Sequence, residues 1–348
     1  MPEKTKPNLV DHPAQLLRMG KRLMESGRVR EAGSLARKAV AERPDDGLIR
    51  AIAETISTHH VPRFHQSMLQ DGPRNRVYRR SIEEEVRGRR VLDIGTGSGL
   101  LAMMAARAGA AHVYACELDA RLAATAREIV EQNGLGDRIT VLAAHSTKLD
   151  RNKDLGGGVD LVISEVFGSD LLAEGALASL RDARARLCLP AATFLPGRAS
   201  IRIALAECAV REPQTRVDAF KDVEGFDISL FGRHVRRHRS FEAGDPRLRL
   251  RSAPADLFSF DFSGDTGSED RAAITCISHG GLVTGILQWI AFESRSGHRY
   301  ENAPEPEARS HWWLNHYALE IPIETLPGDR LIVHGWRDDH ALLCWAGR

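Results

Sequence analysis

The chain has 348 residues, of which 43% are hydrophobic and 27% are charged, and its formal net charge is +1. This length allows more than one buried core, and the near-neutral charge excludes a global field that would favour nucleic acid or a membrane surface. We expect a soluble cytoplasmic protein, because no apolar run approaches membrane-spanning length and no apolar signal segment is present. Five widely spaced cysteines without a CxxC pair favour neither a metal site nor a disulfide framework.

Residues 12–43 repeat apolar positions with the period of a helix. The pattern is interrupted at Ser26 and Gly27 and ends at Arg43 and Pro44, which predicts two helices in a hairpin. Its small residues and the final proline resemble one tetratricopeptide repeat. Because one repeat cannot stack on itself, we expect residues 1–50 to be a structural appendage, packed on this chain or on a second subunit, rather than a peptide-binding array.

From Ile82 to Phe194 the sequence pattern is different, because helical stretches alternate with short apolar runs. The runs that predict strands are residues 91–94, 113–116, 139–142 and 159–164. This βαβ pattern predicts a parallel sheet with helices on both faces. We assign residues 51–195 to an α/β, Rossmann-like domain of the seven-stranded type and expect its ligand at the carboxyl ends of the strands.

Residues 91–99, Val-Leu-Asp-Ile-Gly-Thr-Gly-Ser-Gly, predict a sharp turn from a strand into a helix. At Gly95 and Gly97 the missing Cβ lets the backbone come close to a ligand, and the helix that follows presents free N–H groups. Dinucleotide sites use a similar turn with an acid about 20 residues on. Two acids favour S-adenosylmethionine over NAD. Asp93 would repel a pyrophosphate but not a sulfonium, and Glu117 can accept hydrogen bonds from both ribose hydroxyls.

Two further acids follow the fourth predicted strand. Glu165 comes directly after Ser164, and Glu174 lies at the far end of a loop that contains a glycine. If the loop doubles back, both carboxylates face one pocket, a geometry suited to a guanidinium with its five donors in a fixed fork. The alternative is that one glutamate caps a helix and the other is solvated.

After Pro196 the pattern changes to strand-like segments separated by Gly, Pro and Asp. These segments are residues 199–204, 273–276, 282–292 and 317–323. They predict an antiparallel, β-barrel-like domain over residues 196–348.

Four motifs then occur in the order typical of one family. They are residues 65–78, the pair Glu165 and Glu174, residues 225–229, and Ser310-His311-Trp312. Over residues 60–348 the chain resembles the protein arginine methyltransferases. The resemblance implies an enzyme that transfers a methyl group from S-adenosylmethionine to a guanidinium nitrogen of arginine. A nicotinamide oxidoreductase would leave the double-glutamate and His-Trp motifs unexplained.

The glycine turn and the resemblance together define the expected cofactor contacts. The expected cofactor-binding residues are His65, Met68, Arg74, Asp93, Gly95, Gly97, Glu117, Ser146 and Glu165. Of these, the resemblance implies that Arg74 holds the methionine carboxylate.

The resemblance also implies the catalytic residues. Glu165 and Glu174 would bind the guanidinium, together with Trp312, and leave lone-pair density on the nitrogen that is methylated. His311, paired with Asp71, would relay the proton that the product loses, with a packed core histidine as the alternative.

The sequence departs from the family at several positions. The Tyr-Phe-x-x-Tyr segment is missing, since Thr55 and His59 stand about where its tyrosines would fall, and Val166 and Phe167 replace the usual Trp-Met after Glu165. These changes favour the monomethylating and symmetric branches over the asymmetric one, without deciding the product.

Residues 217–239 place aromatic side chains such as Phe226 among charged ones. A projection of this kind cannot bury them alone, and the matching arm in the family reaches a second subunit, so we expect a homodimer. The basic patch at residues 233–239 would suit the carboxylate of free L-arginine, as in streptozotocin-type metabolism, if it lies near the pocket; a solvated face is the alternative. Protein arginine and free arginine both remain open, and a non-catalytic adaptor is a further alternative.

Overall fold

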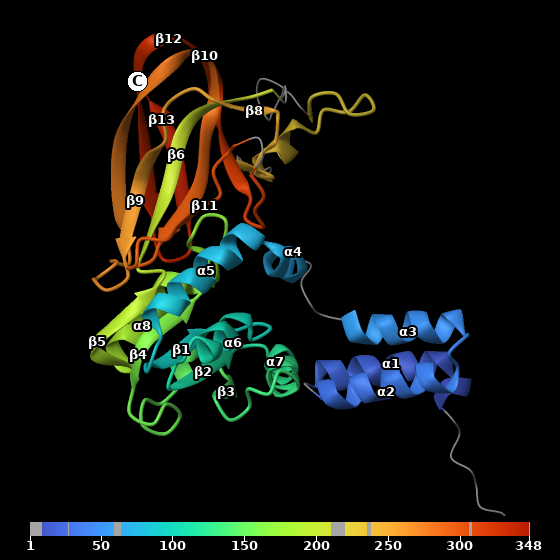
Figure 1. The fold of residues 1–348 in the computed structure, drawn as a ribbon. Helices are drawn as coiled ribbons and strands as arrows, with labels where there is room; N and C mark the ends of the chain where they lie inside the picture. The colour runs from blue at the N-terminus through green and yellow to red at the C-terminus, as the bar shows by residue number, and fades with distance from the viewer. Residues whose placement is uncertain are drawn as a thin grey trace, which may run out of the picture.

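The computed structural model describes residues 9–26, 28–58, 64–209, 220–234, 238–305 and 308–347, and Figure 1 shows that they form three parts in chain order. A unit of helices lies to one side of a parallel sheet that is flanked by helices, and an antiparallel domain stands above that sheet. The predicted mixed α/β class, with a β domain after the parallel sheet, is confirmed.

The N-terminal unit contains three helices. A short turn, η1 (Leu9–Asp11), precedes α1 (Pro13–Glu25), α2 (Val29–Glu42) and α3 (Gly47–Thr58). All three contribute to one separate hydrophobic cluster, and at Gly20 a Cβ would lie 2.3 Å from Ile56, so α1 and α3 approach closely. The expected hairpin of α1 and α2 is present, but the cluster continues through α3, and the predicted boundary at residue 50 falls inside that helix. Gly27 lies outside the described residues.

The parallel domain begins with two helices and continues as alternating strands and helices. Its elements are α4 (Phe64–Gln70), α5 (Gly72–Glu85), β1 (Arg90–Ile94), α6 (Leu100–Arg107), β2 (His112–Glu117), α7 (Ala120–Gln132), β3 (Ile139–Ala143), β4 (Val159–Ser164), α8 (Ala176–Arg186) and β5 (Cys188–Leu195). The strand order is β3-β2-β1-β4-β5, and every pairing is parallel. Among the described residues the sheet has five strands rather than the seven of the expected type, because the chain leaves it after β5.

The strand order places the site. From β1 the chain first adds β2 and β3 on one side and then β4 and β5 on the other side. In sheets of this kind the crevice for a ligand lies at the carboxyl ends of the strands where the order reverses, here β1 and its neighbours. The four predicted strands correspond to β1, β2, β3 and β4. Their carboxyl ends therefore bring Gly95, Glu117 and Glu165 to one edge, as the sequence predicts.

The antiparallel domain is a strongly curved sheet. Its strands are β6 (Arg198–Cys208), β7 (His238–Phe241), β8 (Leu248–Leu250), β9 (Ala255–Asp261), β10 (Asp270–Glu293), β11 (Arg299–Glu301), β12 (Leu314–Arg337) and β13 (Leu342–Gly347). The segments predicted separately at 273–276 and 282–292 are parts of the single strand β10, which pairs with β12 from Asp270 to Gln288. Register shifts after Ile277 and Val283 let these long strands bend without ending.

One hydrophobic core continues from the parallel domain into the antiparallel domain. Tyr78 of α5 packs on Phe292 of β10, with ring centroids 5.4 Å apart, and Phe292 contacts Tyr300 and Trp312 in turn. Side chains from the antiparallel domain are therefore held in a fixed position above the carboxyl edge of the parallel sheet.

The segment 220–234 projects from the side of the antiparallel domain and includes η5 (Ser229–His234) (Figure 1). Phe226 and Leu230 are 70% and 69% exposed. Residues 217–219 and 235–237 lie outside the described residues, so the basic patch at 233–239 is described only in part. In the part of the chain that the structure describes, no helix is long and apolar enough to cross a membrane.

Candidate active site

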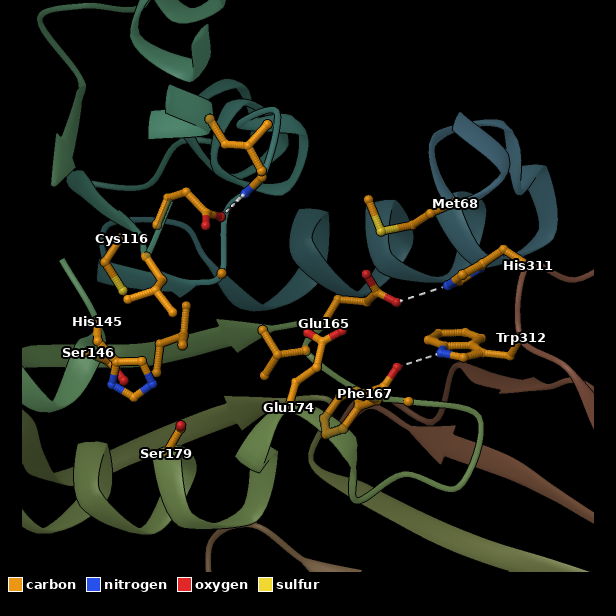
Figure 2. A pocket seen from close by; sticks show the side chains of 18 of the residues that line it. Met68, Cys116, His145, Ser146, Glu165, Phe167, Glu174, Ser179, His311 and Trp312 are labelled. Atoms are coloured by element: carbon orange, nitrogen blue, oxygen red, sulfur yellow. Dashed lines mark hydrogen bonds and ion pairs between the residues drawn. The ribbon is translucent and has the colours of Figure 1, made fainter. Parts of the chain in front are cut away.

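A cavity of about 660 Å³ opens at the carboxyl edge of the parallel sheet, beneath the antiparallel domain (Figure 2). Nine of the expected site residues line it: Met68, Gly95, Gly97, Glu117, Ser146, Glu165, Glu174, His311 and Trp312. Asp71, Arg74 and Asp93 do not line the cavity but lie behind its wall. The side chain of His65 lies outside the described part of the chain.

The glycine turn forms one side of the cavity. Gly95, Gly97 and Gly99 have φ of 72°, 53° and 83°, a region that residues with a Cβ adopt only at a cost. The N–H of Gly97 donates to Glu117 at 3.0 Å, and the N–H of Asp119 donates to the other oxygen of the same carboxylate at 2.9 Å. The Glu117 carboxylate is thus fixed beside the turn, at the end of β2.

Contrary to the expectation from the sequence, Asp93 does not face the cavity. It is fully enclosed beneath the turn, where one oxygen accepts a 2.6 Å hydrogen bond from the hydroxyl of Thr96. Burial raises the pKa of Asp93 to about 6. Its position makes it a brace for the turn, because the strand directs its side chain into the core and not toward the ligand edge.

The loop between the two glutamates doubles back. Leu171, Glu174 and Gly175 all have positive φ, at 72°, 65° and 68°, a conformation that is strained for the first two. Figure 2 shows that the carboxylates of Glu165 and Glu174 consequently point into the same space. Burial, and then the nearby charges of Glu165 and Glu117, raise the pKa of Glu174.

The antiparallel domain holds this loop in place. The indole N–H of Trp312 donates to the carbonyl of Phe167 at 2.6 Å, and the backbone N–H of Trp313 donates to the Ser169 hydroxyl at 2.9 Å. The amide of the fully buried Gln288 donates to the Ser169 carbonyl at 3.0 Å. These bonds offset the backbone strain of the loop.

A chain of buried charges connects the two domains. Arg74 lies 2.7 Å from one oxygen of Glu165, and Nε2 of His311 lies 3.2 Å from the other. On its opposite side, Nδ1 of His311 lies 3.0 Å from Asp71. All four side chains are at most 6% exposed, so these charges interact with little screening by water.

The protonation of this chain follows from its contacts. Burial by itself would lower the pKa of His311, but the hydrogen bonds to Asp71 and Glu165 outweigh it and raise that pKa. Burial would raise the pKa of Asp71, yet its donors, His311 first, hold that pKa below its usual value. His311 therefore carries its proton to higher pH than an ordinary histidine.

Several cavity or network residues were not predicted. Tyr300 donates its hydroxyl to Asp71 at 2.9 Å, Gln288 clamps the glutamate loop, and Ser179 lines the cavity. No motif marks these residues. Their roles depend on contacts between distant segments, such as the 229 positions that separate Asp71 from Tyr300.

Residues 80–179 match the family model described as ribosomal protein L11 methyltransferase (PrmA). The chain is 35% identical over 331 residues to an arginine N(omega)-methyltransferase of Streptomyces achromogenes subsp. streptozoticus, covering 92% of this chain and 90% of the relative. It is 30% identical to protein arginine N-methyltransferase 7 of Danio rerio, covering 80% of this chain but 45% of that protein.

The fold matches solved structures. One is the Trypanosoma brucei PRMT1 enzyme-prozyme heterotetrameric complex with AdoHcy, with a TM-score of 0.70 and 24% identity over 82% of this chain and 98% of that one. Another is PRMT6-SAH, with a TM-score of 0.61 and 23% identity over 81% of this chain and 99% of that one. Given the long Streptomyces match, which spans almost the whole of both sequences, the chain belongs to the family of S-adenosylmethionine-dependent arginine N-methyltransferases.

Proposed function

We propose that this protein methylates a terminal guanidinium nitrogen of arginine within the cavity described above. The observation that carries the proposal is the pair Glu165 and Glu174, whose carboxylates face one cavity together with His311. S-adenosylmethionine, when bound, supplies a sulfonium methyl: a nucleophile attacks its carbon, the new N–C bond forms as the C–S bond breaks, and S-adenosylhomocysteine leaves.

The residues of the cavity fit that cofactor. The Ser146 hydroxyl is buried in the cavity wall and has no hydrogen-bond partner among the described residues. Nε of Arg74 is also buried without a described partner, but Arg74 lies behind the cavity wall and is paired with Glu165. We assign the ribose to Glu117 and the methionine end to the turn at Gly95 and Gly97. Arg74, Met68 and His65 stay as further expected contacts.

The glutamates activate the acceptor. A guanidinium is a poor nucleophile because its nitrogens share their lone pairs with the central carbon. Glu165 and Glu174 would bind two of its nitrogens, localise the positive charge there, and align the remaining terminal nitrogen for in-line attack. Formation of the new N–C bond leaves a proton on that nitrogen. Glu165 would pass this proton to His311, 3.2 Å away, when the imidazole is neutral.

Two forms of the substrate are compatible with this chemistry. The relative matched along 90% of its length is named for arginine, whereas the chain spans less than half of the Danio rerio protein arginine methyltransferase. This pattern favours free L-arginine, with protein arginine as the second candidate.

We further propose a homodimer joined through the segment 220–234. The exposure of Phe226 and Leu230 supports this proposal, since such side chains are typical interface anchors. A reducing cytoplasmic environment is supported by the five cysteines, none of which forms a disulfide.

Mass spectrometry after incubation with S-adenosylmethionine tests the function directly. Reactions with free L-arginine and with an arginine-glycine peptide run in parallel, and methylarginine in either one supports the proposal while its mass and fragmentation give the number and position of methyl groups. Binding of S-adenosylhomocysteine without a methylated product from either substrate would favour the adaptor alternative.

A further inference from the structure

We propose that Tyr300 is a positioning residue for the His311–Asp71 pair, and that its hydroxyl sets the pH range in which His311 can accept a proton. This role rests on the proposed methyl transfer. It differs from the roles of the cavity residues because Tyr300 does not line the cavity and acts only through Asp71.

The structure holds the Tyr300 hydroxyl in one place. Tyr300 lies on β11 and is 5% exposed, with its ring stacked on Phe292 at 5.1 Å and tilted against Trp312 at 5.5 Å. Its oxygen lies 2.9 Å from Asp71 and 2.8 Å from the Ser310 hydroxyl. A ring packed on two sides cannot swing away, so the hydroxyl stays directed at the carboxylate.

Tyr300 and His311 share one carboxylate oxygen. Oδ2 of Asp71 receives the Tyr300 hydroxyl, the His311 backbone N–H at 3.2 Å and the His311 ring at 3.0 Å. Among the described residues, Oδ1 of Asp71 receives only the backbone N–H of Arg74, at 2.9 Å. Each donor on an oxygen withdraws negative charge that the others would otherwise feel, so Tyr300 competes with the imidazolium for Asp71.

Removing the Tyr300 hydroxyl does not alter the other charged groups near His311. In the described part of the chain, the charged and titratable groups near the ring are Asp71, Arg74, Glu165, Glu174 and Tyr300. Removing the phenol hydroxyl leaves more of the Asp71 charge to His311, which favours the imidazolium and raises the pKa of His311. The relay then becomes neutral, and able to accept a proton, only at higher pH.

The variant Tyr300→Phe removes one oxygen and keeps the packed ring. We expect the acid limb of the kcat profile, measured from about pH 6 to about pH 9, to move up by roughly half a unit or more. At neutral pH kcat should fall several-fold and then recover toward the wild-type value at high pH. The KM for arginine should change less than about twofold, because no substrate contact is lost.

The matched control is Tyr114→Phe, which removes a tyrosine hydroxyl from β2 that bonds Arg90 and lies outside the cavity lining. It should leave the pH profile in place. A loss in Tyr300→Phe that is equal at every pH, or an unchanged profile, would overturn the proposal.

An NMR titration of the His311 ring separates this proposal from the proposed function. It needs no turnover, and His311→Asn identifies the signal by its disappearance. A higher pKa of His311 in Tyr300→Phe than in the wild type supports the positioning role even if the acceptor is not arginine. An unchanged pKa of His311 refutes it, even where the wild type makes methylarginine.

Discussion

The imidazole of His311, carried by the antiparallel domain, lies 3.2 Å from the carboxylate of Glu165 at the end of β4. One loop thus reaches across the domain boundary to complete a site whose acids belong to the parallel sheet. The contact couples the glutamate that would bind the guanidinium to an imidazole that can gain and lose a proton.

Replacing either Glu165 or Glu174 with Gln should lower turnover by roughly 100-fold or more, because the side-chain volume stays but the charge that polarises the guanidinium is lost. Affinity for S-adenosylhomocysteine, measured by calorimetry, should change little in Glu174→Gln. The matched control is Glu131→Gln on the exposed face of α7, which should behave as wild type. Near-normal turnover in both active-site variants would rule out the assignment of these acids.

The pH dependence of turnover should follow His311. Since the pKa of His311 is raised above its usual value of about 6.5, the ring stays protonated, and unable to accept a proton, to a higher pH. We expect kcat to rise with pH through this raised pKa, and the limb to vanish in His311→Gln, whose residual rate is low at every pH. A wild-type rate that is flat from about pH 6 to about pH 9 would exclude His311 from the proton path.

Glu117→Ala should weaken binding of S-adenosylhomocysteine by about 1.5 to 3 kcal/mol, the usual loss for hydrogen bonds to a charged group. The variant also removes the acceptor of the hydrogen bond from the Gly97 N–H, so part of the loss in binding comes from a looser turn. Comparison with Glu117→Gln distinguishes the loss of charge from the loss of the whole side chain. Unchanged affinity by calorimetry would place the adenosine elsewhere.

The double variant Phe226→Asp, Leu230→Asp should convert the proposed dimer into monomers, because it places charges on a surface that a partner must desolvate. Light scattering at micromolar concentration measures the mass of both proteins. A wild-type monomer would end the dimer proposal. A dimer that persists in the variant would move the interface elsewhere, with residues 12–43 as the next candidate.

Much of the parallel domain could be predicted because its signals are local. An apolar run makes a strand, three glycines make a turn with positive φ, and the next strand ends at an acid; these features place Gly95, Glu117 and Glu165 at one edge without any long-range information. The spacing of Glu165 and Glu174 likewise pointed to one pocket. The hairpin of α1 and α2 followed from helical periodicity in the same way.

Tertiary structure decided what depends on distant contacts. Whether α3 belongs to the N-terminal unit rests on its packing at Gly20, and whether β10 is one strand or two rests on its pairing with β12. Asp93 turns into the core, although its position in the motif suggests a ligand contact.

The hydrogen-bonded chain from Tyr300 through Asp71 and His311 to Glu165 shows the same division most clearly. Asp71, His311 and Glu165 belong to recognisable motifs and Tyr300 does not, but the partner of each lies on another element and often in the other domain. Residue propensity and hydrophobic periodicity predict the type of element and which of its faces is buried. Only the packing of the two domains around one core determines which side chains then meet, because hydrogen bonds and ion pairs depend on distances of a few ångströms.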